Sequence, residues 1–346
     1  MTIVETLEKL SNAFGVAGRE EEVRRLMKKF LKPYVDEVTE DKLGNVIGIK
    51  KGKKNAPRVM LAAHMDEIGL LVKTISKEGY LQFMKIGGID DRVLLAQKVL
   101  VCTEKGYLHG IIGSKPPHIQ KEDERKRVLP WDELFIDIGA ESREEAEKMG
   151  VRIGDAVCFD VKFARIGKNV LIGKAFDDRV ACSVLIEAMK GLAKTDCTVY
   201  AVGTVQEEVG LRGATTSAFG IDPDFGIAID VTVAGDTPGV KDVEAPVKMN
   251  KGPALTVADS GLIVHPKVLQ LLVNAANENK IPYQLETGLS GSTDAARISI
   301  SRAGVPSGVI SVPTRYIHSP TSMLSLKDAE NAVRLTIAAV QKIPQF

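Results

Sequence analysis

The sequence predicts an α/β fold in which a mostly parallel sheet, with helices on both faces, is interrupted by an inserted, small β-barrel-like unit. After Gly167, short apolar segments alternate with amphipathic helical segments, which is typical of a parallel sheet covered by helices. Residues 68–166 instead contain strand-like segments broken by glycine-containing turns, and only 142–149 has helical spacing there. We therefore expect one discontinuous α/β domain, 1–67 and 167–346, with a β-rich domain, 68–166, inserted into it.

Residues 1–63 are predicted to form two helices, a hairpin and a buried strand. A capping-box pattern at Thr2 opens an amphipathic segment, and a second helix is expected at about 20–33. Alternation of apolar and polar residues around Gly44-Asn45 predicts a hairpin. The continuous apolar run 57–63 predicts a strand that is buried on both faces.

The second half alternates between predicted helices and strands, and the last helix opens on an N-cap pair, Ser325 with Asp328. Helices are expected at about 179–193, 266–279 and 292–301, and strands at 197–205, 224–230, 283–287 and 306–312. Within the inserted unit, the basic run 121–127 is interleaved with acids and is expected to be an exposed loop.

Composition narrows the functional classes. The 346 residues, 44% of them apolar and 26% charged, allow roughly two domains with a large core. A net charge of +1 gives no overall field that would attract nucleic acid or an anionic membrane, and no apolar run approaches the ~18–20 residues that span a bilayer. The N-terminal segment lacks the pattern of a signal peptide. The four cysteines stand singly, which favours reduced thiols in a cytoplasmic protein.

Five residues of the types that bind metal ions lie at predicted strand ends or in adjoining loops. They are His64, Asp177, Glu208, Asp230 and His318. In open parallel sheets, ligands bind beyond the carboxyl ends of the strands, so these side chains are expected to converge on one edge. The set is too large for one tetrahedral ion and suits two divalent ions that share a carboxylate. Imidazole and carboxylate donors suit zinc or cobalt, and also manganese or iron.

A balanced allocation gives each ion one histidine and one private carboxylate. We place His64 with Asp230, and Glu208 with His318, and let Asp177 bridge the two ions. Asp178 is the alternative to Asp177, because either acid of this pair precedes the helix. Taken singly, each of these acids could equally be a helix cap, an exposed charge or a turn residue.

Two further acids have predicted roles in catalysis. Glu207 stands beside Glu208 and points in another direction, so it is the candidate general base and then general acid. Asp66 lies two residues after His64, on the same face of an extended segment, and is expected to orient the imidazole.

Other motifs receive structural interpretations. His109 and His265 are expected to be structural, and His118 lies in a proline-rich loop from which it reaches an active site only as a less favoured alternative. The segment 288–296 opens a helix whose N–H groups either bind substrate or simply cap the helix. The segment 86–92 contains a second Asp-Asp-Arg element and is expected to be a turn.

Five motifs in this order, AAHMDEIG, GKAFDDR, VQEEVGLRGA, AIDV and RYIHSP, resemble those of the tetrahedral-aminopeptidase and glutamyl-aminopeptidase family of dinuclear metallopeptidases. The resemblance covers essentially the whole chain. It implies a dinuclear zinc exopeptidase-like fold and removal of N-terminal residues from peptides. It also implies the ligand set above with Asp177 bridging, Glu207 as the catalytic acid and Asp66 in support of His64. The family's inserted domain drives dimerisation, and its dimers commonly assemble into a hollow tetrahedral dodecamer.

Three other functions fit parts of the pattern. A deacylase of N-acyl amino acids or sugars would use the same dinuclear centre. A glycoside hydrolase would use paired carboxylates without metal. A non-catalytic protein would use metals to hold its fold, but structural sites are usually closed and often rich in cysteine.

Overall fold

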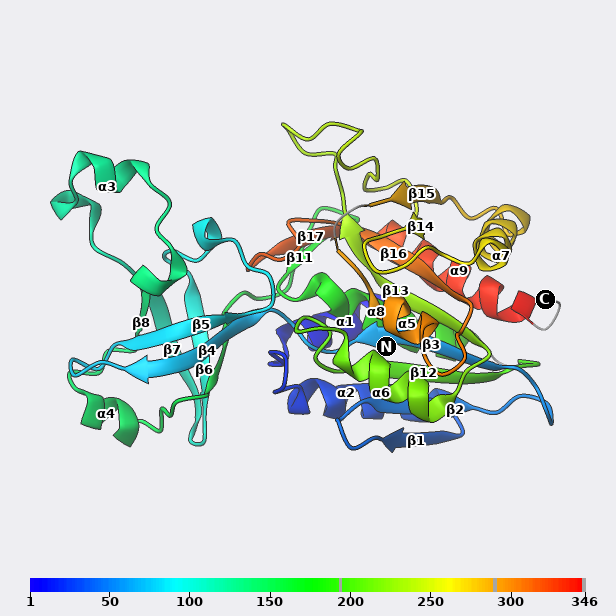
Figure 1. Cartoon of the computed structure of the whole chain (residues 1–346), viewed down its shortest axis with the longest axis horizontal. Helices are drawn as coiled ribbons and strands as arrows, with labels where there is room; N and C mark the ends of the chain where they lie inside the picture. Colours follow the sequence, from blue (N-terminus) through cyan, green and yellow to red (C-terminus); the bar gives the residue numbers. More distant parts are fainter. Residues whose placement is uncertain (193–194, 289–290, 344–346) are drawn as a thin grey trace.

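The computed structural model describes residues 1–192, 195–288 and 291–343. Figure 1 shows a barrel at one end of the long axis and a larger sheet flanked by helices at the other. Within the described ranges, every helix is too short or too polar to cross a lipid bilayer. The end predicted for the helix 179–193 and part of the segment 288–296 lie outside the described residues.

The large sheet has a parallel centre and antiparallel flanks. Its strands are β1 (Glu37–Glu40), β2 (Val46–Lys50), β3 (Arg58–His64), β10 (Ala164–Ile166), β11 (Val170–Gly173), β12 (Thr198–Thr204), β13 (Phe225–Val233), β14 (Ala254–Ala258), β15 (Gln284–Thr287), β16 (Ser307–Arg315) and β17 (Ser322–Ser325). The central order β12-β3-β13-β16 is parallel throughout. The carboxyl ends of these four strands therefore meet at one edge, which confirms the predicted fold class and prepares the site.

Helices cover both faces of this sheet. They are α1 (Ile3–Asn12), α2 (Glu21–Leu31), α5 (Phe176–Gly191), α6 (Arg212–Ile221), α7 (Pro266–Glu278), α8 (Asp294–Ser299) and α9 (Leu326–Lys342), with the 3-10 turn η1 (Lys32–Tyr34). Side chains of β3 alternate between two cores, because successive residues of a strand point to opposite faces. Val59 and Leu61 pack with residues of α5 and α9, whereas Met60 and Ala62 pack with residues of α6 and α8. This two-sided burial explains the continuous apolar run in the sequence.

The inserted unit is a closed barrel. Its strands are β4 (Gly69–Ile75), β5 (Leu81–Ile86), β6 (Lys98–Thr103), β7 (Gly106–Gly113), β8 (Phe135–Asp137) and β9 (Ala156–Phe159), with α3 (Glu122–Lys126), α4 (Arg143–Lys148) and the 3-10 turns η2 (Asp91–Val93), η3 (Pro117–Ile119) and η4 (Trp131–Glu133). Alternate strand residues such as Leu70, Val99 and Ile136 fill a core of its own. The barrel thus has a core of its own, while Ala156 and Cys158 of β9 also pack against Phe14 and Val16, which follow α1.

A buried ionic cluster stands where the barrel leaves the sheet. Glu67 lies between the end of β3 and the start of β4, and the Lys174 Nζ donates to both its carboxylate oxygens at 2.7 Å. The Arg179 Nη2 donates to the same carboxylate at 3.2 Å. All three side chains are buried. Buried charges of this kind are held by mutual pairing, so removal of any one partner is expected to be strongly destabilising.

Four local expectations need correction. The helix α6 was not predicted, because its small residues give it no clear apolar spacing. Strand β10, at the end of the range predicted for the inserted domain, pairs with β11 in the large sheet. The run 121–127 includes the short, exposed helix α3. Ser325 stands at the N-cap of α9 but donates its hydroxyl to Asn250 rather than accepting from the helix.

Candidate metal centre

The predicted ligands lie together at the carboxyl edge of the parallel strands. His64 ends β3, Asp177 begins α5, Glu208 follows β12, and His318 lies between β16 and β17. Asp230 lies inside β13, which continues to Val233 instead of ending at Asp230 as the sequence suggested. The recorded pairing of β3 with β13 reaches Ala62 opposite Ala228, and two residues further along each strand Asp230 stands level with His64.

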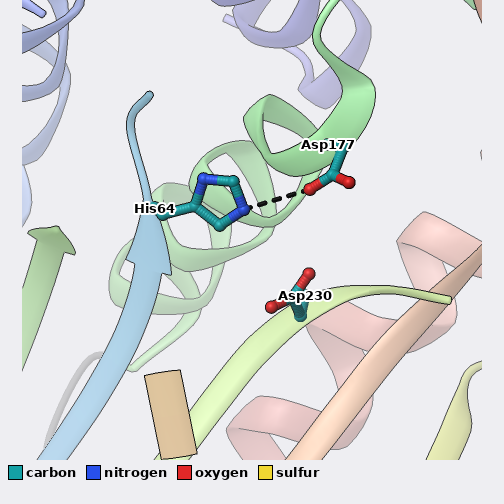
Figure 2. A group of neighbouring side chains, drawn as sticks. All are labelled: His64, Asp177 and Asp230. Carbon is teal, nitrogen blue, oxygen red and sulfur yellow. Dashed lines mark hydrogen bonds and ion pairs between the residues drawn. The ribbon is translucent and has the colours of Figure 1, made fainter. Parts of the chain in front are cut away.

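The ligand atoms form two groups that share Asp177. His64, Asp177 and Asp230 make one group, and Asp177, Glu208 and His318 make the other, with the atoms of each group within 4.8 Å of one another. Figure 2 shows His64 and Asp177 pointing toward each other, with Asp230 facing the pair from β13. The grouping has the same composition as the allocation expected from the sequence.

Asp177 stands between the two imidazoles. Its Oδ1 lies 3.0 Å from the His64 Nε2, and its Oδ2 lies 3.5 Å from the His318 Nε2. Asp178 is fully buried, and its Oδ2 accepts the backbone N–H of His64 at 3.1 Å. The two acids therefore have separate tasks: Asp177 faces the centre, and Asp178 fixes the end of β3. This arrangement favours Asp177 as the shared carboxylate.

The barrel contributes a backbone group to the centre. The His318 Nδ1 lies 2.8 Å from the carbonyl oxygen of Gly88, which identifies Nδ1 as the protonated nitrogen and leaves Nε2 to face Asp177. A Cβ at Gly88 would lie 3.2 Å from the His318 Nδ1, and one at Gly87 would lie 3.0 Å from the Glu208 Oε2. The glycine pair allows the barrel's backbone to approach both residues closely.

Asp66 holds the backbone of the Glu207-Glu208 pair. Its two carboxylate oxygens accept the N–H groups of Glu207 at 2.9 Å and of Glu208 at 3.0 Å. Its Oδ1 lies 3.6 Å from the His64 Nδ1, which is longer than a hydrogen bond. Asp66 thus positions the Glu207-Glu208 pair as well as lying beside the imidazole that it was expected to orient.

The segment 205–208 is fixed by side chains at every backbone N–H. The Asn45 Oδ1 accepts from Val205 at 3.0 Å, and the Glu20 Oε1 accepts from Gln206 at 3.2 Å. The two N–H groups that follow donate to Asp66. Gln206 has a φ of 55°, in the left-handed region that non-glycine residues rarely adopt. Three side chains from distant segments therefore determine where Glu207 points.

Burial dominates the electrostatics of the centre. It raises the pKa of Glu208 well above its usual range, with Asp177 adding to the effect. It also raises the pKa of Asp230 to about 8, although His64 opposes the shift. Burial lowers the pKa of His64, but the surrounding carboxylates, Glu207 foremost, bring the net shift well above the usual value. The negative charges are thus crowded in a poorly solvated place, which cations would relieve.

The donor set fits divalent cations. The Glu208 Oε1 is buried without a hydrogen-bond partner in the described structure, although such atoms are normally paired. Carboxylate oxygens and imidazole nitrogens are ligands of zinc, cobalt and manganese, and no cysteine lies in either group. The residues therefore fit divalent cations, and the two ligand groups have Asp177 in common.

The centre opens into a cleft. Its volume is about 490 Å³, and its lining includes His64, Asp177, Glu207, Asp230 and His318. The described part of segment 288–296 contributes Gly288, Gly291, Ser292 and Thr293 to the wall, so this segment borders the cleft as well as opening α8. A cleft of this size accommodates one or two residues of a peptide.

The three remaining histidines lie away from the described cleft lining. His118 is exposed in η3, and His265 is exposed at the start of α7. His109 is exposed on β7, 3.3 Å from Asp160.

The sequence did not predict the roles of Gly88, Glu20 and Asn45, which act through contacts with backbone groups. The one signal was the Gly87-Gly88 pair, since paired glycines mark close backbone approach.

The comparisons with known proteins identify the family. A model described as M42 glutamyl aminopeptidase matches residues 44–335, and the chain belongs to this family. The lysyl aminopeptidase of Pyrococcus furiosus is 41% identical over 98% of this chain and 97% of its own length.

Solved structures agree with the family and the fold. The crystal structure of a TET aminopeptidase from a marine-sediment Thaumarchaeota archaeon is 48% identical, with a TM-score of 0.95 over 99% of this chain and 97% of that one. The TET1 peptidase of Pyrococcus horikoshii, described as able to assemble into a tetrahedron or a large octahedral shell, is 36% identical. It matches with a TM-score of 0.89 over 99% of this chain and 100% of its own.

Proposed function

We propose that this protein is a metal-dependent aminopeptidase that removes N-terminal residues from peptides. The observation that carries the proposal is the convergence of two imidazoles and three carboxylates on one sheet edge, beside Glu207 in an open cleft. Membership of the M42 family supports the aminopeptidase activity.

The proposed ligands divide into two sets. His64 and Asp230 would hold one divalent cation, Glu208 and His318 the other, and Asp177 both. Bound there, such cations would polarise a peptide carbonyl and lower the pKa of water. The donors suit zinc or cobalt best, with manganese as a further candidate.

Glu207 is the proposed general base and general acid. It would take a proton from the attacking water and return it to the leaving amine. Its carboxylate lines the cleft, and its Oε2 lies 3.8 Å from the His64 Nε2, so it stands beside the centre and outside both ligand groups. Burial raises the pKa of Glu207 well above its usual range, although His64 opposes the shift, and a raised pKa favours both steps of the proton transfer.

The test separates Glu207 from its neighbour. Glu207→Gln should retain near-normal metal content and lose nearly all turnover, by roughly 100-fold or more. Glu208→Ala should instead lose metal, as measured by elemental analysis of the purified protein. If Glu207→Gln kept most of its activity, the assignment of the base would be wrong.

A second experiment distinguishes aminopeptidase from deacylase. An aminoacyl anilide with a free amine is compared with its N-acetylated twin, before and after chelation. Cleavage of the free-amine substrate that disappears with chelation supports the proposal. Cleavage of the blocked twin alone would show a deacylase, and activity that survives full chelation would argue against a metal centre.

We also propose that the chain forms a homo-oligomer through its inserted domain. The Pyrococcus horikoshii relative is described as able to assemble into a tetrahedron or a large octahedral shell, and the match covers 99% of this chain. Light scattering of the purified protein would give the state, with a dodecamer as the expected result. The four cysteines are free thiols, which is consistent with the cytoplasmic location that we propose.

A further inference from the structure

The cleft beside the candidate metal centre has an acidic wall without a basic partner. Beyond the centre itself, its lining carries three carboxylates, from Glu244, Asp259 and Glu286. Among the described lining residues there is neither lysine nor arginine. A partly enclosed cleft lined by one sign of charge concentrates ligands of the opposite sign.

Glu286 is anchored at a defined distance from the centre. It belongs to β15 and accepts a hydrogen bond from the hydroxyl of Thr232. Thr232 lies two residues after Asp230 on β13, so both side chains point to the same face of the strand. Two residues of a strand span roughly 6.8 Å. Thr232, which holds the Glu286 carboxylate, therefore lies about one strand repeat along β13 from Asp230.

Asp259 completes this acidic wall. It directly follows β14, and the parallel pairing of β14 with β15 places Thr256 opposite Glu286. The Asp259 Oδ1 accepts the N–H groups of Gly261 and Leu262 at 2.7 Å. Its Oδ2 is buried and has no hydrogen-bond partner in the described structure. The backbone thus fixes one oxygen and leaves the other unsatisfied.

The two acids have no compensating lysine or arginine among the described residues of the cleft lining. Burial raises the pKa of Asp259, and burial together with the nearby Asp259 raises the pKa of Glu286. Charges that are withdrawn from water are normally paired with an opposite charge or with a metal. Since the described cleft wall provides no cationic side chain, a partner of positive charge has to come from the ligand.

We propose that Glu286, assisted by Asp259, selects peptides whose N-terminal side chain is cationic, namely lysine or arginine. This inference rests on the proposed aminopeptidase function, which places the first peptide bond at the metal centre. The first side chain then extends along the face that Asp230 and Thr232 share. The four-carbon stem of lysine carries its ammonium toward the Glu286 carboxylate, and arginine presents a forked donor set. An acidic side chain is repelled from the same wall.

Glu244 has a smaller part in this selection. It is exposed, and its Oε2 accepts the backbone N–H of Lys241 at 2.9 Å. At the solvent-exposed rim its charge is screened by salt, so it affects the approach of the substrate more than discrimination at the wall.

The test compares substrates that differ in charge alone. The purified, metal-loaded protein is assayed for kcat/KM with anilides of lysine, norleucine, leucine and glutamate, where norleucine matches the lysine stem without its ammonium. The variants are Glu286→Gln and Asp259→Asn, with Glu330→Gln as a control, because Glu330 is exposed on α9 outside the described cleft lining. Melting curves verify that each variant is folded.

The expected result is a preference of the wild type for lysine over norleucine, with glutamate the poorest substrate. Glu286→Gln should lower the lysine-to-norleucine ratio by about 10- to 100-fold, and Asp259→Asn should lower it less. The norleucine value should stay within a few-fold, and Glu330→Gln should match the wild type.

Three outcomes would overturn the inference in distinguishable ways. If leucine or glutamate is the best substrate of the wild type, the cationic preference is wrong while the aminopeptidase function stands. If Glu286→Gln lowers lysine and norleucine alike, the wall binds the α-amine common to all substrates instead of the side chain. If no free-amine substrate is cleaved, both the preference and the proposed function fail.

Discussion

The chain contains the tripeptide Asp-Asp-Arg twice, and the two copies lie in opposite environments. In the barrel, the Arg92 side chain is 71% exposed and bonds back to Asp90. At the start of α5, Arg179 is fully buried and turns away from its own aspartates. It donates instead to Glu67 and to the backbone carbonyls of Met65, Leu10, Ala13 and Gly15. The same three residue types therefore form an exposed ion pair in the barrel and a buried structural contact beside the candidate metal centre.

In each copy, the group that the arginine binds determines whether the neighbouring aspartates are free to contact other residues. Hydrogen bonds from the side chain and the backbone of Arg92 lower the pKa of the Asp90 carboxyl to about 2. This carboxylate is therefore already paired within its own tripeptide. Because Arg179 is engaged elsewhere, Asp177 is available to two imidazoles. Burial raises the pKa of the adjacent Asp178 well above its usual range, and Asp230 adds to the effect.

The largest expected difference between the copies is in catalysis. Asp177→Asn should lower peptidase turnover by more than ~100-fold, since even outer-shell partners of a metal site contribute about 10- to 100-fold. Asp90→Asn, the matched change in the barrel, should leave turnover within about twofold of the wild type. Steady-state assays of both variants at saturating metal check this. Equal losses would mean that the tripeptide matters for a reason common to both places.

The next difference is in stability. Arg179→Met removes one partner from the buried cluster with Glu67 and Lys174, and it should lower the free energy of unfolding by about 3–5 kcal/mol. Arg92→Met removes an exposed side chain and should leave the unfolding midpoint unchanged. Urea titrations followed by circular dichroism measure both. A midpoint for Arg179→Met that matches the wild type would contradict the structural role given to this arginine.

A smaller effect is expected from the glycine that stands two residues before the barrel copy. Gly88→Ala places a methyl group 3.2 Å from the His318 Nδ1, so the imidazole has to shift. We expect cation affinity to fall about tenfold, as for the loss of an outer-shell partner, with little change in melting. Competition with a metal indicator measures the affinity. Gly220→Ala is the control, because a Cβ there meets open space; an equal loss in both variants would exclude a specific role for Gly88.

The smallest expected effect is on the pH dependence of stability, and it comes from Glu20, a buried acid that is not paired with an arginine in the described structure. Burial raises the pKa of Glu20 from 4.5 to about 7. Between these two values the folded chain keeps a proton that the unfolded chain has released, so stability should fall as the pH rises through that window. Glu20→Gln should flatten this part of the stability profile, as measured by urea unfolding at several pH values. A wild-type profile that rises from pH 5 to 7 to the same extent as in Glu20→Gln would contradict the assignment.

The sequence was most informative where side chains carry the chemistry. Strand-end positions predicted the ligand groups around His64 and His318, because the carboxyl ends of parallel strands share one edge. It was least informative where the backbone carries the chemistry, as at the Gly88 carbonyl, or where a distant acid such as Glu20 holds a loop. Such contacts depend on how the barrel and the first helices are placed in space, and no local pattern records that placement.

The ionic cluster at the root of the barrel also limits how the molecule can move. Glu67 lies three residues after His64 and two residues before the start of β4. It pairs with Lys174 and with Arg179, which follows Asp177 by two residues. Moving the end of β3 away from the start of α5 would separate charges that are out of contact with water, at a cost of several kcal/mol. The point at which the chain enters the barrel is therefore held at a fixed place relative to the start of α5, which carries Asp177.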